Sequence, residues 1–336
     1  MRQSRIIGMI VLALCVPLLN GACDSERSSD RPRYRRIVRI AVVGEARDEP
    51  TWPMLQSMAA GYQRRDPMVS VRVIAPDTPS PRAQQKLLEG LLDADFHVVC
   101  IIPTDPLAIR PAIKGLVKGG RPVVTIGRDV PASHRSVYCG PLEVSMGKTA
   151  AAACRLALAG RPRTLMVLHA GEDHEVYRAR RLALIHELPF LGDIRVLKEV
   201  DCAGNPGNAS RLTRIQSKQY PRVGGWVFLE DWALREIPPA DRLLPLGCGL
   251  VLCNGSPRYF DRVRNGEIQA LVVFDYYEAV EKALEAATRL AEGDQTGFLP
   301  ICSVEPEIVT GKELKQFERR WRAWQEGKSS QELNPG

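Results

Sequence analysis

The segment His97–Asp129 reads HVVCIIPTDPLAIRPAIKGLVKGGRPVVTIGRD, and its pattern is the strongest indication of a fold class in the chain. It opens with an apolar, β-branched run, His97–Ile102, and closes with a second one, Pro122–Ile126. Between these runs, apolar residues recur at helical spacing and stop at the glycine pair Gly119-Gly120. A strand, a helix and a strand with short loops predict a βαβ crossover, in which neighbouring parallel strands are buried on both faces.

Polar residues follow both apolar runs at the points where the predicted strands end. Pro103-Thr104-Asp105 follows the first strand, and Gly127-Arg128-Asp129 follows the second. Ligands of parallel sheets bind at the carboxyl ends of the strands. These two tripeptides therefore indicate a binding site at one edge of the predicted sheet.

Two segments of this region resemble a known family. Ile102-Pro103-Thr104-Asp105 and the run PVVTIGR, Pro122–Arg128, are similar in order and spacing to segments of the sugar-binding branch of the periplasmic solute-binding proteins, the group typified by ribose-binding protein. The resemblance extends from about Ile37 to about Thr310. It implies a type I periplasmic binding fold, in which two doubly wound, Rossmann-like α/β lobes are joined by a hinge and the ligand binds in the cleft between them.

The resemblance and the pattern of strands and helices together predict a domain organisation. The final strand is expected over Ile301–Val309, and an amphipathic helix over Leu314–Gln325. The predicted parts are a signal peptide (1–22), a lipid-anchored linker (23–36), a first lobe (37–141 plus 275–298), a second lobe (142–274 plus 299–312) and a C-terminal helix and tail (313–336).

The start of the chain has the pattern of a secretory signal. Arg2 and Arg5 precede an apolar run, Ile6–Leu19, which is too short to span a bilayer comfortably. The next residues, Asn20-Gly21-Ala22-Cys23, resemble a bacterial lipobox, although Asn20 occupies the position that usually holds leucine. The sequence therefore predicts lipidation at Cys23 and a membrane-anchored protein of the periplasm or cell envelope. A signal peptide without lipidation is the alternative.

The basic charge does not favour a nucleic-acid partner. The chain has a formal net charge of +7, but residues 1–39 carry +5 of it and residues 312–336 carry +2. The body between them has 32 basic and 32 acidic residues. A domain that binds nucleic acid is expected to concentrate positive charge on its own body.

The resemblance also implies a set of site residues. Glu49-Pro50-Thr51-Trp52 stands where the family has aromatic residues that sandwich the sugar, so that Trp52 keeps one aromatic and Thr51 loses the other. Arg178 matches an arginine that holds sugar hydroxyls. The ligand-binding residues predicted in this way are Glu49, Thr51, Trp52, Arg128, Arg178, Glu230, Asn254 and Phe274.

Departures from the family pattern bear on the ligand. Gly127 and Asn254 replace aspartates, whereas Arg128 and Arg178 are kept, which predicts a more positive pocket and adds a sugar acid or phosphorylated sugar to the candidate ligands. Loss of binding is a further alternative. So is pairing of either arginine with a nearby acid on the surface, such as Asp129 or Glu175.

The resemblance implies a binding protein that uses no cofactor and catalyses no reaction. It captures a sugar-like ligand for an ABC transporter permease; a receptor that reports the ligand to a membrane kinase or chemoreceptor is the alternative. Gly147-Lys148-Thr149 is reminiscent of a P-loop, but Leu142 stands where a P-loop requires glycine. A polar loop containing His169, Glu172, Asp173 and His174 is interpreted as helix capping rather than as a metal site.

Overall fold

Two six-stranded sheets form the framework of the computed structural model, which describes residues 36–294 and 299–333. The first sheet has the strand order β11-β5-β4-β3-β1-β2, and within the described residues all of its neighbouring strands run parallel. Its strands are β1 (Val38–Val43), β2 (Val69–Ile74), β3 (Val98–Ile101), β4 (Val123–Ile126), β5 (Val137–Gly140) and β11 (Ile301–Ser303).

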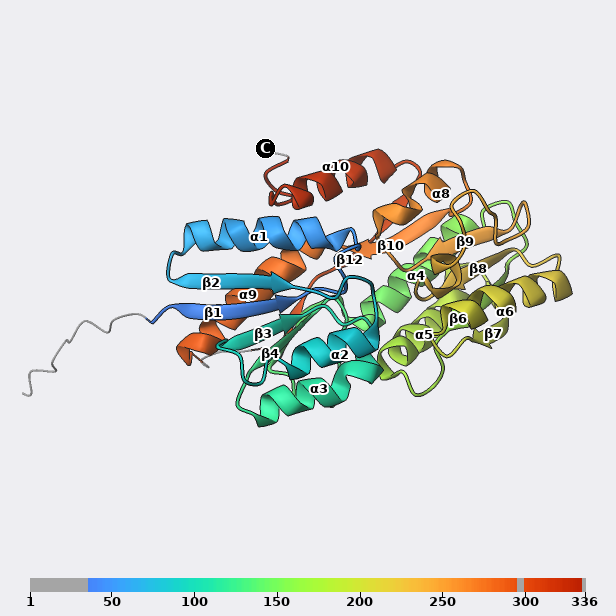
Figure 1. Cartoon of the computed structure of the whole chain (residues 1–336). Helices are drawn as coiled ribbons and strands as arrows, with labels where there is room; N and C mark the ends of the chain where they lie inside the picture. The colour runs from blue at the N-terminus through green and yellow to red at the C-terminus, as the bar shows by residue number, and fades with distance from the viewer. Residues whose placement is uncertain (1–35, 295–298, 334–336) are drawn as a thin grey trace, which may run out of the picture. The chain divides into compact units, whose positions relative to one another are not determined.

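Helices cover both faces of the first sheet, because its strands are apolar on both sides (Figure 1). On one face the core includes α1 (Thr51–Arg65) and α9 (Tyr276–Glu292), and on the other it includes α2 (Pro81–Glu89) and α3 (Pro106–Lys118). The βαβ crossover predicted from the central segment is confirmed as β3, α3 and β4. Asp105 begins α3 by accepting hydrogen bonds from the backbone N–H groups of residues 107 (2.8 Å) and 108 (3.1 Å).

The second sheet has the order β12-β10-β9-β8-β6-β7. In the part of the chain that the structure describes, only its edge strand β12 runs antiparallel to its neighbour. Helices pack on this sheet too, so the predicted architecture of two doubly wound α/β lobes is confirmed. The strands are β6 (Thr164–His169), β7 (Arg195–Asp201), β8 (Gly225–Phe228), β9 (Gly249–Leu252), β10 (Ala270–Phe274) and β12 (Pro306–Thr310). The helices are α4 (Glu143–Ala157), α5 (Glu175–Glu187), α6 (Pro206–Gln219), α7 (Trp232–Arg235) and α8 (Phe260–Arg264), with short 3₁₀ turns η1 (Leu188–Leu191) and η2 (Pro257–Tyr259).

The chain passes between the two sheets three times: after β5, after β10 and after β11. The last passage corrects the prediction of one continuous strand and of a second-lobe segment that starts at residue 299. Strand β11 pairs with β5 of the first sheet, with Cys302 opposite Cys139, and only β12 joins the second sheet. Pro306 has no N–H to donate and occupies the first position of β12, a typical place for proline at the start of a new strand.

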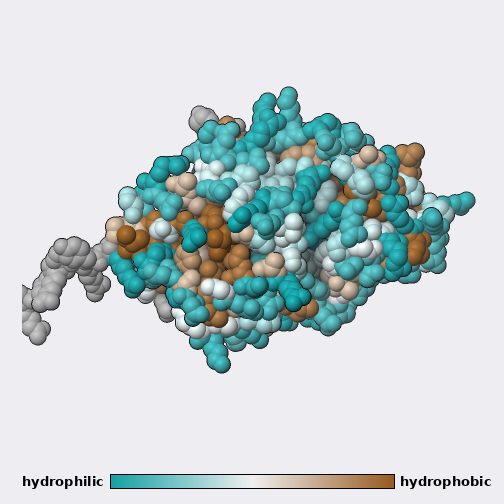
Figure 2. Space-filling model, viewed as in Figure 1, coloured by the Kyte–Doolittle hydropathy of each residue, from teal (hydrophilic) through white to brown (hydrophobic). Residues whose placement is uncertain are grey.

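The predicted C-terminal helix forms as α10 (Leu314–Gln325) and contacts α1, α8 and β12. Most of the face seen in Figure 2 is hydrophilic, with a hydrophobic area over strands of the first lobe. Within residues 36–294 and 299–333, no helix has both the length and the apolar character needed to cross a membrane. The predicted signal peptide, most of the linker and Cys23 lie outside the described residues.

The sequence Gly147-Lys148-Thr149 lies inside α4 and not in a phosphate-binding loop. A Cβ on Gly147 would come within 2.3 Å of the backbone oxygen of Arg180 in the neighbouring helix α5. The glycine is therefore explained by close packing of two helices.

Candidate functional site

Residues from both lobes line a cavity of about 20 Å³, room for one or two water molecules. Both lobes belong to one unit, Ile37–Gly336. Most of the lining residues lie at or just after the carboxyl ends of β3, β4, β8, β9 and β10, as expected for parallel sheets, while Met146 and Arg180 come from helices α4 and α5. They include Gly127 and Arg128 from the first lobe and Glu230, Asn254 and Phe274 from the second.

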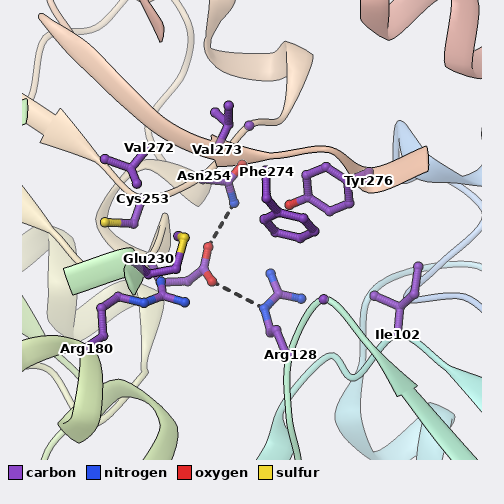
Figure 3. Close-up of a pocket in the computed structure, with 13 residues that line it drawn as sticks. Ile102, Arg128, Arg180, Glu230, Cys253, Asn254, Val272, Val273, Phe274 and Tyr276 are labelled. Carbon is purple, nitrogen blue, oxygen red and sulfur yellow. Dashed lines mark hydrogen bonds and ion pairs between the residues drawn. The ribbon is translucent and has the colours of Figure 1, made fainter. Parts of the chain in front are cut away.

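Glu230 lies at the centre of this cavity, with only 4% of the residue exposed (Figure 3). One carboxylate oxygen accepts a hydrogen bond from the side-chain amide of Asn254 (2.8 Å), and the other accepts one from Nε of Arg128 (3.3 Å). Burial acts to raise the pKa of Glu230, but the guanidinium groups around it outweigh burial and lower that pKa. The glutamate is therefore held as an anion.

Arg128 follows β4 and connects the two lobes. Its Nη1 donates to Glu45 Oε1 (2.5 Å) and to the carbonyl oxygen of Pro103 (3.0 Å), both in the first lobe, while its Nε reaches Glu230 in the second. Burial opposes the charge on the guanidinium, but the two carboxylates raise the pKa of Arg128 well above its usual value. The cleft thus contains a buried, charged bridge between the lobes.

The arginine that helix α5 places in the cavity is Arg180 and not the predicted Arg178. Arg180 is 3% exposed; its Nη1 donates to the carbonyl oxygen of Leu229 (2.6 Å) and its Nε to Glu143 (2.7 Å). Arg178 is exposed and lines neither this cavity nor the second one described below. Two residues along an α-helix correspond to a rotation of about 200°, so the two side chains leave the helix in nearly opposite directions.

Aromatic rings form one wall of the cavity. Phe274 and Tyr276 stack with their ring centroids 4.1 Å apart and their planes 31° apart. Gly127 has φ +70°, and a Cβ on it would lie 3.2 Å from the Phe274 ring. The glycine therefore permits both the left-handed backbone and the close approach of the ring.

A second cavity of about 30 Å³ adjoins the first and shares Arg128, Asn254 and Tyr276 with it. Glu49 lines this cavity and forms an ion pair with Arg258 of the second lobe (3.2 Å). Burial, together with the nearby charge of Glu45, raises the pKa of Glu49 to about 7. The other residues that line it are Glu45, Pro50, Thr51, Asp231, Arg235, Ser256 and Trp321.

Of the predicted aromatic contacts, Trp52 lines neither cavity, whereas the preceding Thr51 does. Trp52 is partly buried, and a Cβ added to Gly44 would lie 3.7 Å from its ring. The two residues occupy the first turn of α1, where successive side chains point about 100° apart. The helix therefore presents Thr51 to the cleft and turns Trp52 toward its own lobe.

The cleft does not carry the predicted excess of positive charge, because Glu45 and Asp231, which were not among the predicted residues, add two carboxylates to those of Glu49 and Glu230. The two cavities together are lined by four carboxylates (Glu45, Glu49, Glu230 and Asp231) and three guanidinium groups (Arg128, Arg180 and Arg235). The surface pairs considered in the sequence do not form either: Asp129 pairs with Arg135 (2.6 Å) and Glu175 with Arg110 (3.7 Å).

The polar loop after β6 is organised by local contacts. Nδ1 of His169 accepts a hydrogen bond from the backbone N–H of Gly171 (3.0 Å), and Glu172 forms an ion pair with Arg181. Among the residues that the structure describes, no group of three or more His, Cys, Asp or Glu side chains is placed to hold a metal ion.

Sequence reasoning missed six of the charged and aromatic residues that line the two cavities: Glu45, Arg180, Asp231, Arg235, Tyr276 and Trp321. Three of them carried a usable signal, because Glu45 and Tyr276 come two residues after the ends of β1 and β10, and Asp231 comes three residues after the end of β8. Trp321 carried none, because nothing in its local pattern distinguishes a ring in a cleft from a ring in a core.

Comparisons with known proteins agree with this architecture. Residues 40–295 match a family model described as a periplasmic binding protein domain. No curated protein matches the chain significantly in sequence.

Several solved structures share the fold. A solute-binding protein of an ABC transporter from Burkholderia graminis, in complex with D-arabinose, superposes with a TM-score of 0.68, at 16% identity over 83% of this chain and 97% of that one. One from Agrobacterium vitis, bound with α-D-tagatopyranose, gives a TM-score of 0.69 at 13% identity over 84% and 98% of the two chains. A glucose-galactose binding protein from Geobacillus stearothermophilus gives 0.67 at 17% identity over 83% and 99%.

Proposed function

Because the chain belongs to the periplasmic binding protein family, as its sequence predicted, we propose that it captures a neutral sugar or sugar-like polyol in the cleft between its lobes. The family consists of solute-binding proteins and not of enzymes. The ligand would be passed to the permease of an ABC transporter. The similar structures named above were solved with sugars or described as sugar-binding proteins, which supports this ligand class.

The observation that carries the proposal is the shared lining of the cleft. Arg128 of the first lobe and Arg180, Glu230 and Asn254 of the second present charged or amide groups to one cavity beside the stacked rings at residues 274 and 276. Carboxylate, amide and guanidinium groups supply both donors and acceptors, which a polyol requires. Stacked rings supply an apolar surface for the C–H face of a sugar ring.

The charges in the cleft favour a neutral ligand over a sugar acid. Four carboxylates and three guanidinium groups line the two cavities, and each guanidinium already has a carboxylate partner: Arg128 with Glu45 and Glu230, Arg180 with Glu143, and Arg235 with Asp231. An anionic ligand would therefore compete with carboxylates that are already in place. A neutral polyol can instead use their unused lone pairs as acceptors.

A thermal-shift screen tests the proposal. We expect at least one of D-arabinose, D-allose, D-fucose and myo-inositol to raise the melting temperature, by about 5 °C or more at a hundredfold excess over Kd, because binding only to the folded state stabilises it. D-Glucuronate serves as the charged comparison and is expected to have a smaller effect. No shift with any neutral sugar, or a larger shift with the acid, would contradict the proposal.

Two arginines on the same helix provide a matched pair of variants for the sugar that binds. Arg180→Gln removes a guanidinium that lines the cavity, whereas Arg178→Gln changes an exposed one. We expect the first to weaken binding by about tenfold or more, as for a lost charged hydrogen bond, and the second to leave it unchanged. Calorimetry measures both affinities, and equal affinities would remove Arg180 from the site.

Export and anchoring belong to the same proposal. The leader pattern that ends at Cys23 supports a mature protein that begins with an acylated Cys23 and is held at a membrane of the cell envelope. Mass spectrometry of the N-terminal peptide tests this. An unmodified N-terminus after residue 23 would exclude lipidation while leaving sugar binding untouched.

A further inference from the structure

Helix α10 contacts both lobes although it lies outside the residues that match the family model. On the side of the first lobe, the hydroxyl of Ser57 donates to the carbonyl oxygen of Gln325 (2.7 Å). On the side of the second lobe, Arg320 forms an ion pair with Glu307 (2.6 Å). Figure 1 shows the helix running alongside α1 and reaching α8. It therefore spans the two lobes.

Trp321 of this helix lies between one aromatic ring from each lobe. Its centroid is 6.4 Å from that of Phe260 in the second lobe and 5.6 Å from that of Tyr276 in the first, both in edge-to-face geometry. The residue is 3% exposed and also lines the second cavity. Its ring is thus a wall of the cleft and not only a part of the core.

Two buried polar atoms of residues lining the second cavity lack a hydrogen-bond partner within the described part of the chain: Nε1 of Trp321 and Oγ1 of Thr51. Buried polar groups normally have partners. An indole N–H can only donate, whereas a hydroxyl both donates and accepts. An alcohol group both donates and accepts, so it is a suitable partner for either atom.

We propose that the second cavity is a subsite for a hydroxyl group of the ligand, with Trp321 as its donor and Thr51 as a second partner. This inference rests on the proposed function and names the ligand group that this part of the cleft recognises. Glu45, Glu49 and Asp231 line the same cavity against two guanidinium groups, so a neutral hydroxyl fits the charge balance better than a carboxylate does. The C-terminal helix is then a part of the binding site.

Trp324 provides the matched control on the same helix. It is fully buried, its Nε1 donates to the hydroxyl of Ser330 (3.0 Å), and it does not line the cavity. We expect Trp321→Phe to weaken binding of the tightest sugar in the panel by about 3- to 10-fold, as for one lost hydrogen bond, while Trp324→Phe leaves the affinity unchanged. Thr51→Val, which keeps the shape but removes the hydroxyl, is expected to act like Trp321→Phe.

Calorimetry on the full mature chain measures these affinities, and tryptophan emission gives a second readout. The change in emission on adding the sugar should be lost in Trp321→Phe and kept in Trp324→Phe. If the parent binds a sugar and neither Trp321→Phe nor Thr51→Val weakens binding, the subsite is overturned and the proposed function stands. If no sugar in the panel binds the parent, both the proposed function and the proposed subsite are rejected.

Discussion

Arg128 is held in place by ion pairs with carboxylates on both sides of the cleft. Its side chain is 12% exposed, and those of Glu45 and Glu230 are 13% and 5% exposed. Removing one partner of such a buried pair typically costs about 3–5 kcal/mol, because the remaining charge is left without compensation. An exposed pair contributes about 0–1 kcal/mol. The charges in the cleft therefore matter more for stability than the ion pairs on the surface.

Glu49 leads to a prediction about pH at the scale of a single residue. Its folded-state pKa is raised from 4.5 to about 7, so between these values the folded protein binds more protons than the unfolded chain. Stability must then fall as the pH rises from 4.5 to 7 and level off above 7. Glu49→Gln removes this contribution, and we expect its stability relative to the parent to rise across the same window by up to about 3 kcal/mol.

Urea unfolding at half-unit pH steps measures the effect of this substitution. Glu313→Gln is the control, because hydrogen bonds from Thr310 lower the pKa of that carboxyl and its contribution has the opposite sign. A stability difference between parent and Glu49→Gln that does not change between pH 4.5 and 7 would contradict the assignment.

At the scale of elements, the packing of α4 on α5 determines where Arg180 lies. Gly147 of α4 faces the backbone of α5 so closely that a Cβ would also come within 2.8 Å of Ala183 and 2.9 Å of the backbone nitrogen of Leu184. Backbone atoms cannot rotate away as a flexible side chain can. Any side chain at residue 147 must therefore push the helices apart and displace the arginine that lines the cavity.

Two glycine-to-alanine substitutions test this packing. We expect Gly147→Ala to destabilise the protein by about 2 kcal/mol or more through overpacking and to weaken sugar binding. Gly115→Ala is the control: Gly115 lies in α3 with nothing within 4 Å of an added Cβ, so alanine should stabilise by about 0.5–1 kcal/mol through its helix propensity. Chemical denaturation measures both, and equal effects would show that Gly147 is not in a tight contact.

At the scale of the whole described unit, ion pairs join the two lobes around the cleft. Arg128–Glu230 lies inside it, while Glu49–Arg258 and Arg110–Glu175 lie nearer the solvent, where one or both partners are more exposed. The cavities of about 20 and 30 Å³ that remain are smaller than a sugar needs. If a sugar binds in the cleft as proposed, we expect it to enter when the lobes separate at the three connecting segments, which is a hinge motion.

Removing the buried bridge should favour this separation. We expect Arg128→Gln to have a larger radius of gyration than the parent in small-angle scattering, because two carboxylates that face the cleft gain water when the lobes part. Arg135→Gln is the control, since Arg135 pairs with Asp129 within one lobe at similar burial (14% and 16% exposed). Both variants should lose stability by about 3 kcal/mol, but only the first should expand. Equal radii for the two variants would argue against Arg128 as a bridge between lobes.

The fold class, and the edge of each sheet at which the site lies, could be predicted from the sequence alone. Apolar runs and helical spacing reflect local backbone hydrogen bonds and burial, so β3, α3 and β4 could be predicted from their own residues. Positions that directly follow a strand are equally local, and Arg128, which that reasoning placed at the edge of the sheet, lines the first cavity. So do Glu230, Asn254 and Phe274, which the resemblance implied.

Which helical residues reach the cleft, and which lobe each of the final strands joins, depends on tertiary packing. Arg180 rather than Arg178, and Thr51 rather than Trp52, face the site because of how each helix is rotated when it packs on its sheet. Strand β11 joins the first sheet because an edge of that sheet is available to it. Trp321 lies near the end of the chain and reaches the cleft because α10 packs on both lobes. These outcomes depend on contacts between residues distant in sequence, which no local pattern encodes.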